Sequence, residues 1–158
     1  MGTMVIYDSL YGNTEKIAQT IANILRQTSE VVIFRVGDVK PEQLTGIGLL
    51  VVGSPTQQFR PTAAMRNFLN HLPKNGLKGM KVAAFDTRLT LAEIEKTPPL
   101  AFFERIFGYA DRRMVKIMKN KGGELALPGE GFFVQGMKGP LVEGELERAE
   151  QWARKLFA

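Results

Sequence analysis

Residues 3–14 read Thr-Met-Val-Ile-Tyr-Asp-Ser-Leu-Tyr-Gly-Asn-Thr, an apolar run that passes directly into a polar loop. The first part of this stretch, residues 3–8, is short and apolar, as is usual for a strand buried in a parallel sheet. Residues 13–28 follow, and their isoleucine and leucine side chains recur at the spacing of an amphipathic helix. The stretch therefore predicts a buried strand, a polar turn and a helix in succession.

The same alternation of strand and helix continues along the chain. Strands that alternate with helices usually pair in parallel through right-handed crossovers. Because no repeat, low-complexity segment or linker interrupts the pattern, we predict an α/β fold and a single domain over residues 1–158. We expect further strands at residues 30–36, 48–53, 81–86 and 132–134, with 124–126 pairing beside the last, and further helices at 62–72, 110–121 and 142–157.

Composition narrows the chemistry that the chain can support. Its 158 residues are 44% hydrophobic and 23% charged, which is typical of a globular protein rather than a disordered one. Because it has no cysteine, disulfides, thiolate metal sites and a cysteine nucleophile are excluded, and redox chemistry would need a bound cofactor. No apolar run approaches the ~18 residues of a membrane span, and the N-terminus does not resemble a signal peptide. We therefore expect a cytoplasmic protein with no membrane partner.

The chain is basic, with a net charge of +5 and a sequence pI of about 9.6. Such a charge suits nucleic acid, an acidic protein or a cofactor phosphate, and equally a face that meets only solvent. Lysine and arginine side chains concentrate in the helix expected at 110–121, where a solvated face and a docking surface are both open interpretations. Charge alone does not identify a partner, and we do not expect nucleic acid.

The strongest functional signal is the loop Ser9-Leu10-Tyr11-Gly12-Asn13-Thr14, which leads from the first strand into the first helix. Ser9 and Thr14 offer hydroxyl donors, and Gly12 lets the backbone turn tightly and approach a ligand. The free N–H groups at the start of the helix favour an anion. Because the loop contains no lysine, it is not a nucleotide-triphosphate P-loop. The alternative is a capped strand-to-helix turn without a ligand.

A second signal, Gly53-Ser54-Pro55-Thr56-Gln57-Gln58-Phe59-Arg60-Pro61, follows the third strand. The segment is polar, is stiffened by two prolines and carries one aromatic side chain, Phe59, that could cover a flat ring. Backbone groups around Gln57 and Gln58 could bond to the edge of a heterocycle. The alternative is an ordinary loop with Phe59 packed into the core.

A third and weaker signal is Asp86-Thr87-Arg88, which we place in a loop after the fourth strand. In a parallel sheet the loops at the carboxyl ends of the strands share one edge, so all three signals converge on one crevice. A turn with a solvated Arg88 is the alternative. His71 is the only histidine, and we expect it at the surface or capping a helix. The sequence shows no catalytic triad, metal cluster or supported pair of carboxylates.

The first two loops resemble those of flavodoxins. The stretch Val5-Ile6-Tyr7-Asp8-Ser9-Leu10-Tyr11-Gly12-Asn13-Thr14-Glu15-Lys16-Ile17-Ala18 is similar to the opening of flavodoxins, and especially of the flavodoxin domains of flavodiiron-type proteins. Gly53-Ser54-Pro55-Thr56 resembles the second flavin loop of the same superfamily. The resemblance implies a flavodoxin-like three-layer sandwich, in which a five-stranded parallel sheet in the order 2-1-3-4-5 has helices on both faces.

The resemblance also implies that the chain binds FMN without a covalent bond. The first loop would hold the phosphate, and the other two would hold the ring. Neither a catalytic residue nor a metal site is expected. The implied cofactor-binding residues are Ser9, Leu10, Tyr11, Gly12, Asn13, Thr14, Pro55, Thr56, Gln57, Gln58, Phe59, Arg60, Asp86, Thr87 and Arg88.

Three features depart from the flavodoxin pattern. Tyr11 stands where many flavodoxins have a second small hydroxyl residue, and no glycine follows Thr56, where a peptide of the family's loop flips when the flavin is reduced. The chain is basic, whereas electron-carrier flavodoxins are usually acidic. Arg60 and Arg88 add positive charge beside the expected ring, which predicts a less negative flavin potential than in an acidic flavodoxin.

We expect an FMN-binding redox protein, a flavodoxin-like electron carrier that exchanges electrons with a partner protein or a small-molecule acceptor. One alternative is an NAD(P)H-dependent flavin reductase of quinones or small molecules. Another is a flavodoxin-fold interaction module that no longer binds FMN. The segment 89–107, from Leu89 to Phe107, is long and rich in apolar side chains, so it could pack on the core, line a substrate wall or form a homodimer.

Overall fold

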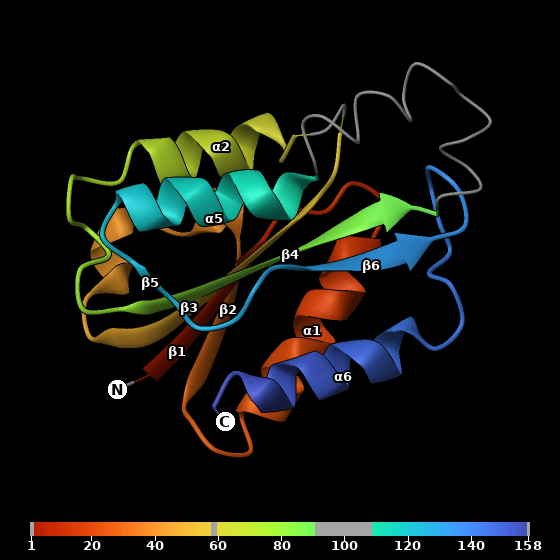
Figure 1. Cartoon of the computed structure of the whole chain (residues 1–158), viewed down its shortest axis with the longest axis horizontal. Helices are drawn as coiled ribbons and strands as arrows, with labels where there is room; N and C mark the ends of the chain where they lie inside the picture. The colour runs from red at the N-terminus through yellow and green to blue at the C-terminus, as the bar shows by residue number, and fades with distance from the viewer. Residues whose placement is uncertain (1, 58–59, 91–108, 158) are drawn as a thin grey trace.

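The computed structural model describes residues 2–57, 60–90 and 109–157, in which six strands form one parallel sheet (Figure 1). The strands are β1 (Gly2–Tyr7), β2 (Val31–Arg35), β3 (Ile47–Pro55), β4 (Lys81–Leu89), β5 (Glu124–Leu125) and β6 (Glu130–Val134). Neighbouring strands follow the order β2-β1-β3-β4-β5, and β6 also pairs with β4. The predicted order 2-1-3-4-5 is confirmed, with its fifth position shared by two short strands.

The fifth position is divided because pairing stops between β5 and β6. β5 pairs with the start of β4, where Glu124 lies opposite Lys81, and β6 pairs with its end, where Val134 lies opposite Leu89. Pro128 lies between the two strands, and proline has no N–H group to donate to a ladder. The apolar pattern predicted both halves but not that they would share one place in the sheet.

Helices cover both faces of the sheet and complete the three layers (Figure 1). α1 and α6 lie on one face, and α2 and α5 lie on the other. The predicted flavodoxin-like α/β sandwich is thus confirmed. The helices are α1 (Asn13–Leu25), α2 (Ala63–Asn70), α5 (Ala110–Asn120) and α6 (Glu145–Lys155), and the 3-10 turns η1 (Val36–Asp38) and η2 (Pro41–Leu44) lie between β2 and β3.

A hydrophobic core lies on each side of the sheet. Between the sheet and the α1–α6 layer, the rings of Phe85, Phe132 and Trp152 meet edge to face, with centroids 6.1 to 6.4 Å apart. Gly53 of β3 leaves room for this cluster, because a Cβ atom there would stand 2.0 Å from the Phe85 ring. On the other side, methionine and leucine side chains of α2 and α5 pack on β1, β3 and β4. The carboxyl ends of these strands are therefore held between two packed layers.

Some elements begin or end away from their predicted positions. The last helix begins at Glu145 rather than at residue 142, because Gly144 at its N-cap has a φ of +90°, which is not helical. β3 and β4 are longer than predicted and extend through Pro55 and Leu89. These extensions matter for the site, because they carry predicted loop residues into the sheet.

Two predicted features lie outside the described residues. They are the tip of the second loop, Gln58 and Phe59, and the part of segment 89–107 that begins at residue 91. The proposed roles of these residues, including the homodimer, therefore stay predictions. Within the described ranges, no helix is both long enough and apolar enough to cross a membrane.

Candidate functional site

A cleft of about 630 Å³ opens at the carboxyl edge of the sheet, and this volume lies within the ~300–1,000 Å³ that is usual for small-molecule sites. The loops after β1 and β3 line it, together with the ends of β4 and β6. Gly12 and Asp86 do not line the cleft. Most other predicted site residues do, namely Ser9, Leu10, Tyr11, Asn13, Thr14, Pro55, Thr56, Gln57, Arg60, Thr87 and Arg88.

Gly12 shapes the first loop through its backbone. It is the N-cap of α1 and has a φ of +93°, a conformation that residues with side chains rarely adopt. The backbone N–H groups of Leu10 and Tyr11 make no hydrogen bond to the described residues, and neither do those of Asn13 and Thr14. Unpaired N–H groups at the N-terminus of a helix form a site for an anion. The loop therefore offers several backbone donors to a phosphate.

The predicted hydroxyl donors also hold the loop in place. The Ser9 Oγ atom accepts from the Gly12 N–H at 3.0 Å and from the Glu15 N–H at 3.4 Å, which leaves its own hydrogen free to donate. The Thr14 and Thr87 hydroxyls lie 2.8 Å apart and are buried, so one donates to the other. This pair ties α1 to β4 across the base of the cleft.

Asn13 and Tyr11 bring the loop after β6 to this site. The Asn13 Nδ2 atom donates to the Lys138 carbonyl oxygen at 3.2 Å. The Lys138 Nζ atom lies 5.9 Å from the centroid of the Tyr11 ring, at the outer limit of a cation–π contact. Lys138 thus adds positive charge near the first loop. Nothing in the sequence pointed to this residue, because it is far along the chain from the loop that it meets.

Asp8 joins the first two loops, although we did not select it from the sequence. Its Oδ1 atom accepts from the Ser9 N–H at 2.9 Å, and its Oδ2 atom accepts from the Thr62 hydroxyl at 2.6 Å. Thr62 is also the N-cap of α2. The Arg35 guanidinium donates to the Ser9 carbonyl oxygen at 2.9 Å and lies 3.6 Å from the Asp8 carboxylate. The sequence signals that could have predicted this contact were an acidic residue directly after a strand, Asp8, and a threonine directly before a helix, Thr62.

The second loop turns sharply between Gln57 and Arg60. Each of these residues donates its N–H to the carbonyl oxygen of the other, at 2.8 and 2.9 Å. The Thr56 N–H donates to the Thr87 carbonyl oxygen at 2.9 Å. The Gln57 N–H is therefore engaged inside the turn, so of the backbone groups of Gln57 only the second lone pair of the carbonyl oxygen could meet a ligand. Contacts from Gln58 and Phe59 stay predictions.

The predicted third loop is wrong, because Asp86, Thr87 and Arg88 belong to β4. Strand alternation places Asp86 and Arg88 on the face that carries α5, where the Arg88 Nε and Nη2 atoms each donate to the Asp86 carboxylate at 2.7 Å. The Asp111 N–H of α5 donates to the same carboxylate at 3.0 Å. Pairing with β6 continues alongside, so the strand has no reason to end at residue 86.

Asp86 and Arg88 form a buried hydrogen-bonded pair instead of a solvated turn. Burial raises the pKa of Asp86 to about 7, because desolvation outweighs the hydrogen bonds and charge of Arg88. The Arg88 Nη2 atom also lies 3.3 Å from Asp111, and the guanidinium carbon lies 3.6 Å from the centroid of the Tyr109 ring. With two carboxylates beside it, Arg88 is not the free positive charge that we expected next to the ring.

Side chains that the sequence did not single out complete the cleft. Leu89, Val134 and Met137 line one wall, and Met137 is 77% exposed. Leu10 and Tyr11, at the first loop, are each 50% exposed. Leu10, Tyr11 and Met137 therefore form an exposed apolar rim at the cleft. Leu89 and Val134 come together because β6 pairs beside β4, which a one-dimensional pattern does not show.

Outside the cleft, the polar side chains that the structure describes do not assemble a metal site. His71 is exposed at the C-cap of α2, as predicted, and its Nδ1 atom lies 2.6 Å from the Asn67 carbonyl oxygen. Among the residues that the structure describes, no group of three or more His, Asp and Glu side chains could hold a metal ion.

The family profile for the flavodoxin domain matches residues 4–137. The chain belongs to the flavodoxin domain family. Its fold is similar to that of a flavodoxin from the domain Archaea, with 21% identity, full coverage of both chains and a TM-score of 0.75. It is also similar to oxidised flavodoxin 2 from Bacillus cereus, with 22% identity, a TM-score of 0.76 and coverage of 99% of this chain and 98% of that one.

The resemblance to flavodiiron-type proteins is confirmed at the level of the fold. The chain is similar in structure to part of rubredoxin oxygen:oxidoreductase from Desulfovibrio gigas, with 17% identity and a TM-score of 0.72. The match covers 98% of this chain and 35% of that protein. At such identities the shared fold is established, and the ligand has to be argued from the residues of this chain.

Proposed function

We propose that this flavodoxin domain binds FMN and carries electrons between partners. The observation that supports FMN most directly is the first loop, where backbone N–H groups with no partner among the described residues surround the start of α1. A phosphate monoester would satisfy these groups and be favoured by the helix dipole. The Ser9 hydroxyl can add a further donor, because its oxygen already accepts two N–H groups.

The rest of the cleft suits a flat heterocycle attached to that phosphate. Pro55 and Thr56 lie along one wall, and Leu89 and Met137 are apolar side chains in the same cleft. Ligand sites of this kind combine apolar walls with a few well-placed polar groups. When bound, FMN supplies reversible electron transfer, and the chain orients the cofactor and sets the charge around it.

The mouth of the cleft bears on which partners could exchange electrons with the flavin. The exposed apolar rim of Leu10, Tyr11 and Met137 favours exchange with a partner protein or a small-molecule acceptor at the mouth of the cleft. A cytoplasmic location and a single domain over residues 1–158 are part of the same proposal. A reductase that takes electrons from NAD(P)H is the alternative, and Arg60 and Arg66 in the cleft wall are cations that could meet its phosphates.

A flavin titration tests the proposal. Flavin-free protein is titrated with FMN and, as a matched ligand without the phosphate, with riboflavin, and flavin fluorescence is followed. We expect saturable binding of FMN and much weaker binding of riboflavin. Equal affinities would remove the phosphate loop from the site, and no binding of either would favour an interaction module. NAD(P)H oxidation with an added quinone then separates a reductase from an electron carrier.

A further inference from the structure

The excess positive charge of the protein is concentrated in one layer. Residues 60–80 and 109–123, which contain α2 and α5, carry nine lysine and arginine side chains and a single acidic one, Asp111. The rest of the chain carries twelve basic and fifteen acidic side chains. The net charge of +5 is therefore the sum of a strongly basic layer and a mildly acidic remainder. We call the lysines and arginines of residues 60–80 and 109–123 the α2–α5 basic face.

The charges of this face are not neutralised within the described parts of the chain. Asp111, its one acid, lies 3.3 Å from Arg88 of β4. The Arg113 Nε atom is buried and has no hydrogen-bond partner among the described residues, a state that costs stability. Ion pairs between described residues involve only arginines outside this face, namely Arg35, Arg88, Arg148 and Arg154.

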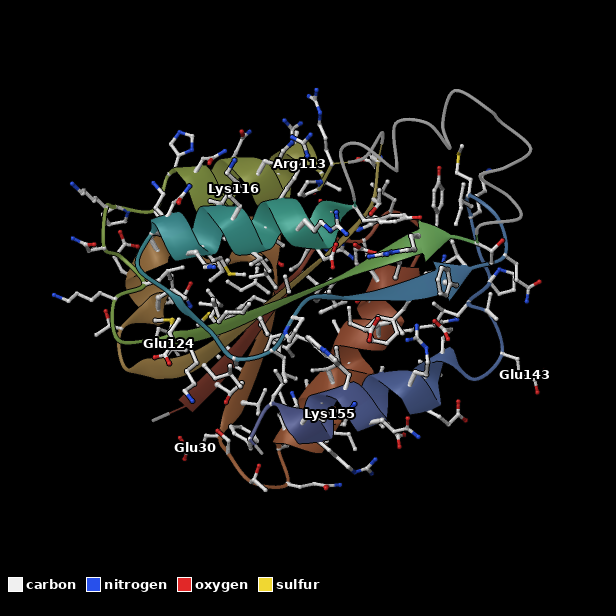
Figure 2. All side chains as sticks on the ribbon, in the orientation of Figure 1. Glu30, Arg113, Lys116, Glu124, Glu143 and Lys155 are labelled. Carbon is white, nitrogen blue, oxygen red and sulfur yellow. The ribbon has the colours of Figure 1, made fainter. Side chains whose placement is uncertain are left out.

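The basic face begins at the mouth of the proposed flavin site. Arg60 and Arg66 belong to the wall of the cleft itself. The N-terminus of α5 is held beside it, because the Ala110 N–H donates to the hydroxyl of the cleft residue Thr56 at 3.2 Å. Figure 2 shows Arg113 on α5, on the side of the sheet opposite α6. A partner on this face would thus lie next to the cofactor.

We propose that the α2–α5 basic face docks a small acidic redox protein against the mouth of the cleft. The proposal rests on the proposed function, because the flavin gives such a partner its purpose. Charge complementarity carries it, since opposite potentials steer association and can raise its rate by roughly 10- to 1,000-fold. The docking face of this protein would then be basic, whereas the surface of an electron-carrier flavodoxin is usually acidic.

Two other anionic partners fit the face less well. A membrane surface is usually bound by basic residues together with apolar side chains that insert between lipids. None of the exposed large apolar side chains among the described residues belongs to α2, α5 or the segments beside them; they are Leu10, Tyr11, Val32, Met137, Leu146 and Phe157. Single-stranded nucleic acid is usually held by aromatic stacking platforms, and the described part of this face exposes no Phe, Tyr or Trp. An acidic protein needs neither feature.

Matched charge reversals test the proposal on the FMN-loaded protein. Arg112→Glu with Lys116→Glu reverses two exposed residues of α5, and Arg26→Glu with Lys155→Glu makes the same change in net charge on exposed residues of the opposite layer. Each protein is titrated with an acidic two-iron ferredoxin over a series of salt concentrations, and with a basic c-type cytochrome as the probe of opposite charge. We expect the α5 variant to bind ferredoxin at least about tenfold more weakly at low salt, and the control to change little.

Several results would overturn the docking proposal. These are equal losses in the two variants, ferredoxin binding that does not weaken with salt, or binding of anionic vesicles or duplex DNA without binding of ferredoxin. FMN affinity is measured on every variant, so a failure of flavin binding is seen separately. If the chain bound no FMN, the proposed function would fail, and the same ferredoxin titration on the flavin-free protein would still decide whether the face docks an acidic partner.

Discussion

Replacing Gly12 with alanine should weaken FMN binding, whereas the same change at Gly144 should not. Both glycines are helix N-caps in the left-handed region, with φ values of +93° and +90°, and a Cβ atom at either would meet no atom within 4 Å. Alanine is disfavoured in this conformation by about 1–2 kcal/mol. For a chain of 158 residues, that corresponds to a loss of roughly 2–8 °C in Tm.

The two variants should differ because only Gly12 orients groups for a ligand. If the backbone of the Gly12→Ala variant relaxes to a negative φ, the N–H groups of Asn13 and Thr14 turn away from the anion site. FMN then has to restore the strained loop, and 1–2 kcal/mol of strain lowers its affinity by roughly 5- to 30-fold. The strain thus shows as lost stability without flavin, as lost affinity, or as a mixture of the two.

Fluorescence titration gives the FMN affinity, and thermal unfolding of the flavin-free protein gives the stability of each variant. Gly144→Ala should lower Tm and leave FMN affinity within about twofold, because neither Gly144 nor α6 lines the cleft. If Gly12→Ala lost as much stability as Gly144→Ala and kept its FMN affinity, the first loop would not be the phosphate site. Equal affinity losses in both variants would show that the effect comes from general instability.

Two further predictions concern buried residues near the site. Asp86 holds its proton up to about pH 7 in the folded chain but only to about pH 4 when unfolded, so stability should fall as pH rises across this window, by up to about 1.4 kcal/mol per unit. Asp86→Asn should flatten that dependence in urea unfolding at several pH values, and an unchanged slope would exclude this carboxyl as its source. Gly53→Ala should destabilise the flavin-free chain by about 1–3 kcal/mol, because its Cβ would overlap the Phe85 ring. A Gly53→Ala variant with unchanged urea unfolding would mean that the ring moves aside freely.

The order of strands and helices was predictable because each element shows its own local pattern of apolar residues. The apolar run before Ser9 has the length of a buried strand, and the repeat after Gly12 has the period of a helix. Element ends were less predictable, since they depend on partners elsewhere in the chain. β4 extends to Leu89 because β6 pairs beside it, and α6 begins late because of the conformation of Gly144.

Only those features of the site that depend on residues within a single loop could be predicted. The first loop could be predicted in this way, because a glycine and a helix N-terminus are sufficient to expose its N–H groups. Asp8 and Lys138 contribute through contacts with Thr62 and Asn13, which lie on other elements and follow only from the packed fold. The Asp86–Arg88 pair was misjudged for the same reason, since the sequence did not show that both side chains point into the sheet's α5 face.

Charge shows most clearly what folding adds to the sequence. Arg60 and Arg88 looked equivalent as cations beside the expected ring, and the structure separates them. Arg88 is bonded to Asp86 and lies 3.3 Å from the Asp111 carboxylate, which offsets its field at the cleft, whereas Arg60 has no carboxylate partner among the described residues. A less negative flavin potential should therefore depend on Arg60 and its neighbour Arg66 rather than on Arg88. The same reasoning supports the proposed acidic partner. The lysines and arginines of the α2–α5 basic face have no ion pair among the described residues, so their charge remains available to another molecule.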